Sequence, residues 1–313
     1  MGLLAIAARV AVACRGAAPE TPIPTPAEAG ADAQPADAGG PAAPEDAAAE
    51  DSGLPAPEGM LLVPGGSFTM GSDEWGERDE RPAHRVTIGS FWLDRVPVTN
   101  ADWQQCVTAR KCRQNDRASI THAGRDEDFL KPKQPVVGVS WDDARGYCAW
   151  RGKRLPREAE YERAARGDDG RKYPWGNDAP TPERACYGRL FGRDAPDDVG
   201  THPSGRGPYG HDDLAGEVWE WTEDEYDPFA YVRAGAEAGV PGTCAEIMTA
   251  LWELRRDGGQ GFTGTNPIPN ECEHVLRGGA WNYFPQGLRA SNRVHHPGRF
   301  RATMAGFRCA KDL

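Results

Sequence analysis

The most informative stretch of the chain is Tyr209–Thr222, which reads YGHDDLAGEVWEWT. It combines two tryptophans, two glycines and four acidic residues and gives no clear helix signal. From Met60 onward the chain has a similar composition: Gly, Pro and Trp are frequent, and helical signals are few and short. A few compact helices within a large, irregular, tryptophan-rich body are typical of an α+β fold.

Three short helices are expected around this stretch. Thr99 and Ser140 each stand where they can cap a helix, and Asp143 can reach back to Ser140 as in a capping box. Gly152 is the expected end of the second helix. A third helix is predicted over 157–166, although its start lacks a good cap. Short strands are predicted at 61–63, 85–88 and 91–93.

The cysteines indicate an oxidising compartment. The chain has eight of them. Seven lie beyond Cys14, so at least one should be unpaired. Cys106 and Cys112 flank a short loop and are the easiest local pair. The sequence contains no C-x-x-C and no zinc-finger spacing, so a structural zinc site is not expected.

The sequence of the N-terminal region predicts an export signal followed by a linker. Residues 1–14 contain an apolar run shorter than a membrane-spanning helix and end in a lipobox-like sequence, so we expect lipidation at Cys14. Ordinary cleavage or no export is the alternative. Residues 15–58 are rich in Ala, Pro and acids and are predicted to be a disordered linker. The resulting expectation is a domain at 59–313 in the periplasm or on the outer surface, held to a bacterial membrane by lipid.

Charge excludes one class of partner. The chain carries a formal net charge of −11, and the segment 14–58 accounts for nine acidic residues against one arginine. From Gly59 onward the 34 basic and 38 acidic residues nearly balance. Without a basic field to attract a phosphate backbone, nucleic acid is not an expected partner.

A series of motifs runs in order across 59–313. They are LVPGGSFTMGS (62–72), RPAHRV (81–86), FWLDRVPVTN (91–100), PVVGVSW (135–141), GKRLP (152–156), YPWG (173–176), Tyr209–Thr222, LRGGAWN (276–282) and GFRC (306–309). Together these motifs resemble the formylglycine-generating enzyme, or sulfatase-modifying factor, family.

The resemblance implies a C-type-lectin-like α+β domain with short strands, two or three short helices and little regular secondary structure, interrupted by a divergent insertion at about 227–270. It also implies a Cys148–Cys309 disulfide, whose long closed loop would be worth about 4 to 5 kcal/mol. Cys244 and Cys272 are then a candidate pair for the insertion, which would leave Cys186 unpaired.

The resemblance further implies a structural calcium site. Its ligands map onto the side chains of Asp213 and Glu220 and the carbonyls of Gly216 and Val218. Oxygen donors along one tight segment suit a hard cation. The alternative is that both carboxylates are solvated charges beside buried tryptophans.

The copper chemistry of the family is not expected. Its active serine falls on Ala280 and its first catalytic cysteine on Tyr283, and no cysteine follows before Cys309. Soft thiolates are the ligands that Cu(I) prefers, so their loss makes copper binding and an active formylglycine-generating oxidase improbable.

The segment that follows is instead predicted to be a ligand-binding surface, as in lectin-like relatives. Aromatic, His and Arg side chains supply contact area with a polar handle. A non-catalytic binding or scaffold protein for an unknown protein, peptide or small molecule is therefore the leading interpretation. The alternatives are an enzyme of altered oxidative chemistry on a peptide or siderophore, and a true formylglycine generator. The surface residues are Asn282, Tyr283, Phe284, Gln286, Asn292, His295, His296 and Arg299.

Overall fold

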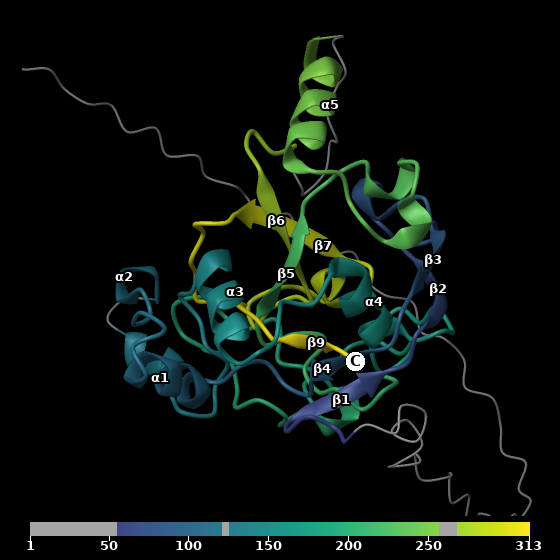
Figure 1. Cartoon of the computed structure of the whole chain (residues 1–313). Helices are drawn as coiled ribbons and strands as arrows, with labels where there is room; N and C mark the ends of the chain where they lie inside the picture. The colour runs from purple at the N-terminus through teal and green to yellow at the C-terminus, as the bar shows by residue number, and fades with distance from the viewer. Residues whose placement is uncertain (1–54, 121–124, 257–267) are drawn as a thin grey trace, which may run out of the picture. The chain divides into compact units, whose positions relative to one another are not determined.

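The computed structural model describes residues 55–120, 125–256 and 268–313, all within the unit Glu45–Leu313 (Figure 1). Residues 1–54, which include Cys14 and most of the predicted linker, lie outside the described residues. No helix in the described part has the length and apolar character needed to cross a membrane.

Within the described ranges the strands are short and form three small sheets. One sheet has the antiparallel order β1–β4–β9, and a second is the β2–β3 hairpin. The third has the order β7–β6–β5–β8, in which only the β5–β8 pair is parallel. The bounds are β1 Met60–Val63, β2 Gly66–Met70, β3 His84–Ile88, β4 Phe91–Asp94, β5 Trp219–Glu225, β6 Glu273–Arg277, β7 Arg293–Pro297, β8 Ala305–Gly306 and β9 Ala310–Asp312.

Five α-helices accompany the sheets in the described residues, more than the two or three predicted. The capping boxes at Thr99 and Ser140 are both present. The third predicted helix starts at Glu158, where the Glu160 carboxylate accepts the Arg157 N–H in place of a side-chain cap. The bounds are α1 Asn100–Thr108, α2 Arg117–Ile120, α3 Trp141–Trp150, α4 Glu158–Arg166 and α5 Cys244–Arg256. Short 3-10 turns lie at Arg78–Glu80, Asp126–Phe129, Pro203–Gly205, Ala230–Val232, Ala236–Ala238 and Pro285–Leu288.

Helix α5 lies inside the divergent insertion and was missed by the sequence analysis. The signal was available: Thr243 Oγ1 accepts the Glu246 N–H, and the Glu246 carboxylate accepts the Thr243 N–H at 2.8 Å. This is the T-x-x-E capping box. The helix buries Ile247 and Leu251.

The largest core cluster lies between helices α1 and α3 and the four-stranded sheet. It includes Trp103, Trp221, Trp281 and Phe307, which are almost completely buried. Edge-to-face contact joins Trp103 to Phe307 at 6.2 Å between ring centroids. The α+β prediction and the C-type-lectin-like family fold are confirmed.

The described residues contain three disulfides. Cys148–Cys309 joins α3 to the residue before β9, with a Cα–Cα distance of 5.6 Å, and both cysteines are fully buried. Cys106–Cys112 closes a loop of separation 6 at the end of α1, and Cys244–Cys272 links the start of α5 to the segment before β6. Cys186 is the free cysteine among the described residues, and it is buried.

The Cys106–Cys112 and Cys148–Cys309 disulfides close loops of very different length. They should therefore contribute different amounts to the free energy of unfolding. Replacing Cys148 and Cys309 together by Ala should lower the free energy of unfolding by about 4 to 5 kcal/mol, because that bridge closes 161 residues. The matched double change at Cys106 and Cys112 should cost only about 2 kcal/mol. Equilibrium denaturation of both variants measures this difference. Equal losses would show that chain closure is not the origin of the stabilisation.

Candidate functional site

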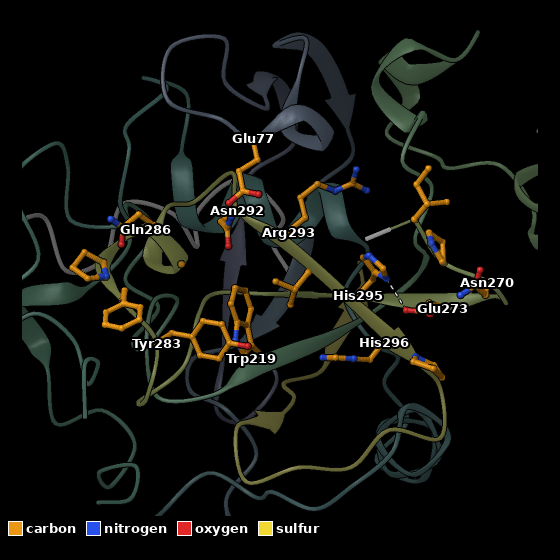
Figure 2. A pocket seen from close by; sticks show the side chains of 17 residues that line it. Glu77, Trp219, Asn270, Glu273, Tyr283, Gln286, Asn292, Arg293, His295 and His296 are labelled. Carbon is orange, nitrogen blue, oxygen red and sulfur yellow. Dashed lines mark hydrogen bonds and ion pairs between the residues drawn. The ribbon is translucent and has the colours of Figure 1, made fainter. Parts of the chain in front are cut away.

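A pocket of about 870 Å³ opens beside strand β7. Tyr283 and Gln286 lie at one side of it and Glu273, His295 and His296 at the other, with Trp219 between them (Figure 2). Much of the lining is apolar, supplied by aromatic, proline, valine and isoleucine side chains. An apolar hollow with a few convergent polar groups is the usual form of a small-molecule site.

The loop after β6 reaches the pocket because two glycines turn the chain. Gly278 and Gly279 have φ values of 99° and 83°. A Cβ at Gly278 would lie 2.5 Å from the Tyr161 hydroxyl, and one at Gly279 would lie 2.8 Å from the Gly287 carbonyl oxygen. Only glycine tolerates both the positive φ and this close approach.

Tyr283 forms the aromatic wall together with Trp219. Their rings meet edge to face, with 5.1 Å between centroids and an interplanar angle of 86°. Ala280, which stands where the family has its serine, is fully buried. Since no cysteine is among the residues that line the pocket, a thiolate copper site has no ligands there.

Six of the eight predicted surface residues line the pocket, namely Tyr283, Phe284, Gln286, Asn292, His295 and His296. Their exposure differs widely, because Phe284 is 76% exposed whereas Asn292 and His295 are both 6% exposed. Asn292 is bound inward, donating to the Glu80 carboxylate at 2.9 Å. Asn282 does not line the pocket. Arg299 also lies apart, in an exposed ion pair with Glu271.

The polar wall centres on His295. Its Nδ1 lies 2.6 Å from Glu273 Oε2, and its ring stacks on Tyr226 with 3.8 Å between centroids. The other ring nitrogen, Nε2, is buried without a hydrogen-bond partner. His296 stacks on Phe300 at 3.7 Å, and burial lowers the pKa of His296.

Comparison with known proteins shows to which family this chain belongs. Residues 45–313 match the model of the sulfatase-modifying factor enzyme 1-like domain. The chain belongs to this family.

Several known proteins are similar to this chain, and their names differ. Hercynine oxygenase of Mycolicibacterium smegmatis is 33% identical over 84% of this chain and 65% of its own length. Inactive C-alpha-formylglycine-generating enzyme 2 of Mus musculus is 37% identical over 54% of this chain and 70% of its own length. The structure of PvdO from Pseudomonas aeruginosa matches 81% of this chain and 94% of its own with a TM-score of 0.60 and 26% identity. The chain thus spans less than two thirds of the hercynine oxygenase that it matches.

The predicted calcium ligands of the sulfatase-modifying factor domain differ in how well they fit a cation. Asp213 is 5% exposed, and its Oδ2 accepts the Gly200 N–H at 2.6 Å. Its Oδ1 is buried without a partner, and burial raises the Asp213 pKa to about 6. A bound cation would stabilise this carboxylate, so Asp213 fits.

Glu220 fits less well. Its carboxylate accepts from Arg308 Nε and Nη2 at 2.7 and 2.8 Å and from the Tyr161 hydroxyl at 3.1 Å. A calcium ion there would have to share Glu220 with a fully buried guanidinium. Neither Glu220 nor Asp213 is a solvated charge, so that alternative is wrong.

A neighbouring cluster already has its own cation. Cys186, Asp197 and Glu217 bring possible ligand atoms within 4.8 Å of one another. His202 Nε2 lies 3.2 Å from Asp197 and 3.4 Å from Glu217, and these two carboxylates raise the pKa of His202 to about 10. Arg189 also pairs with Asp197, so His202 and Arg189 together offset the charge of the two carboxylates. The sequence analysis had not singled out this group.

Calcium at Asp213 is tested by thermal unfolding. Adding calcium after treatment with a chelator should raise the melting temperature of the wild-type domain, because the ion pairs the buried carboxylate. In Asp213→Ala the rise should disappear. Glu253→Ala, which removes an exposed carboxylate on α5, is the control and should keep the rise. A wild-type domain indifferent to calcium would contradict the site.

Proposed function

We propose that this domain binds a peptide or small-molecule ligand in the pocket beside β7 and does not produce formylglycine. The observation that carries the proposal is the pocket itself, formed by the segment in which the family places its catalytic serine and first cysteine. In this chain Ala280 stands at the position of the serine and Tyr283 at the position of the first cysteine. The aromatic lining favours binding, while the loss of both thiolates removes the known route to copper.

The name of the mouse relative supports the non-catalytic part of the proposal. That protein is called an inactive C-alpha-formylglycine-generating enzyme. Its name indicates that the fold can exist without formylglycine production, because function depends on a site rather than on a fold. A domain of this fold can therefore serve in ligand binding alone.

Pocket binding is tested with 4-methylphenol, a probe with an aromatic body and one polar group. Gly287 lines the pocket, and a Cβ there would stand 3.5 Å from both Trp219 and Tyr283. Gly287→Leu should therefore fill the space without strain and weaken the probe about tenfold or more, a loss equivalent to about 1.4 kcal/mol. Calorimetric titration measures the affinity.

The matched control is Gly146→Leu. Gly146 is exposed on α3, and a Cβ there meets nothing within 4 Å. This variant should bind the probe like the wild-type domain. Identical affinity in Gly287→Leu and the wild-type domain would exclude the pocket as the binding site.

An enzyme of altered oxidative chemistry is the second candidate. The name of hercynine oxygenase among the similar proteins favours it. This candidate predicts tightly bound iron or copper in the purified domain, detectable by elemental analysis. Under the leading proposal the protein is free of both metals, and a sulfatase-motif peptide incubated with it, copper and oxygen keeps its cysteine by mass spectrometry.

We also propose export and lipid anchoring through Cys14. The three disulfides support an oxidising compartment. Cells fed labelled palmitate should label the wild-type protein and release it only with detergent. Cys14→Ser should remove the label and the membrane association together. A labelled variant, or an unlabelled wild type, would overturn the anchor.

A further inference from the structure

A thiol, an imidazole and two carboxylates meet outside the pocket beside β7. Cys186, Asp197 and Glu217 bring possible metal-ligand atoms within 4.8 Å of one another. His202 Nε2 reaches the same group, because it lies 3.2 Å from Asp197 Oδ2 and 3.4 Å from Glu217 Oε1. The positions of these residues along the chain follow no zinc-finger spacing, so the sequence did not reveal the cluster.

One oxygen of this cluster lacks a partner. Glu217 is 1% exposed, and its Oε1 is buried and forms no hydrogen bond, whereas its Oε2 accepts the Asp197 N–H at 2.9 Å. Burial raises the pKa of Glu217 to about 7, and a cation beside Oε1 would stabilise the charged form. A buried polar atom without a partner in a native structure calls for an ion or other group that supplies one.

The spacing of the ligand atoms suits a tetrahedral ion. Bonds from zinc to oxygen, nitrogen and sulfur place neighbouring ligand atoms about 3.3 to 3.6 Å apart. The distances from His202 Nε2 to the two carboxylates are close to this spacing, and the other ligand atoms need to approach by roughly 1 Å. The Asp197 side chain is 34% exposed, so an ion can enter from its side.

We propose a structural zinc site in this cluster, with Cys186, Asp197, His202 and Glu217 as its four ligands. Zinc takes thiolate and imidazole ligands, whereas calcium and magnesium take oxygen. Four protein ligands leave no open coordination position, so the ion is structural rather than catalytic. None of the four residues lines the pocket beside β7, so the inference is independent of ligand binding there.

The net charge of the cluster is the same with and without the ion. Without it, His202 and Arg189 offset the two carboxylates. On binding, the Cys186 thiol and the His202 imidazolium each release a proton to solvent, because zinc ligands must be deprotonated. The double charge of Zn²⁺ then replaces the charge of His202 and balances the new thiolate. Arg189 remains paired with Asp197, so the buried group stays neutral.

Cobalt(II) is the spectroscopic probe, because it occupies tetrahedral zinc sites and its absorption reports thiolate coordination. Protein treated with a chelator and titrated with Co²⁺ should develop a sulfur-to-cobalt charge-transfer band and the visible bands of tetrahedral cobalt. An equimolar amount of Zn²⁺ should then remove both. A wild-type protein without the charge-transfer band would overturn the site, whatever the variants do.

Variants identify the ligands. Cys186→Ser should abolish the charge-transfer band. Asp197→Asn should weaken Zn²⁺ about tenfold or more, since even the loss of a residue that only supports a ligand costs that much. Asp198→Asn is the same change at the next residue, outside the cluster, and should bind Zn²⁺ like the wild-type protein. Equal affinity in the two asparagine variants would contradict the four-ligand site.

Two further measurements separate zinc from other cations. A large excess of Ca²⁺ should leave the cobalt bands unchanged, because a hard cation competes poorly for a thiolate. Displacement by Ca²⁺ would overturn the assignment to zinc. Adding Zn²⁺ after chelation should also raise the melting temperature of the wild-type protein, and an unchanged melting temperature would contradict a structural ion.

Discussion

The buried ion pairs between helix α4 and the four-stranded sheet are the constraint on which the site depends. All nine residues of α4 are buried, including Glu158 and Glu162. Glu162 pairs with Arg277 at the end of β6, and Glu158 pairs with Arg293 at the start of β7. A buried charge without its partner costs several kcal/mol, so the helix and the two strands must keep this register.

The register of strands β6 and β7 determines which side chains lie beside the pocket. Arg277 and Arg293 are directly opposite each other in the β6–β7 ladder, and Glu273 and His295 lie farther along the same two strands. Because side chains alternate along a strand, Arg293 and His295 share one face of β7, where both contact Tyr226. The Glu273–His295 contact thus extends the ion-paired layer to the edge of the pocket.

A second buried arginine stabilises the segment that was expected to bind calcium. Arg308 pairs with Glu220 and donates through Nη2 to the carbonyl oxygens of Asp212 and Asp213. It therefore joins the residues before β9 to both ends of the Asp213–Glu220 segment, close to the Cys148–Cys309 disulfide. This internal cation explains why Glu220 and Asp213, similar in sequence context, offer very different ligand chemistry.

The sequence alone determined the family, the α+β class and some of the local elements, namely α1, α3, α4, β1, β3 and β4. Capping residues at Thr99 and Ser140 act within one turn of chain, so their helices could be predicted without knowledge of the fold. The absence of cysteine at Tyr283 could likewise be read directly. The capping box at Thr243 was equally local, so the start of α5 could also have been predicted.

Only the tertiary structure decided which of the predicted residues act together. Glu273 was not singled out by the sequence, because nothing local relates it to His295, 22 residues away. Strand pairing brings the two together, whereas Arg299, only four residues beyond His295, leaves the site for an exposed ion pair. The partner of Glu220 was hidden for the same reason, since Arg308 lies 88 residues farther along the chain. Charges separated by such distances in sequence meet only when the core closes, and the fold then determines whether each carboxylate pairs with an arginine or with a histidine.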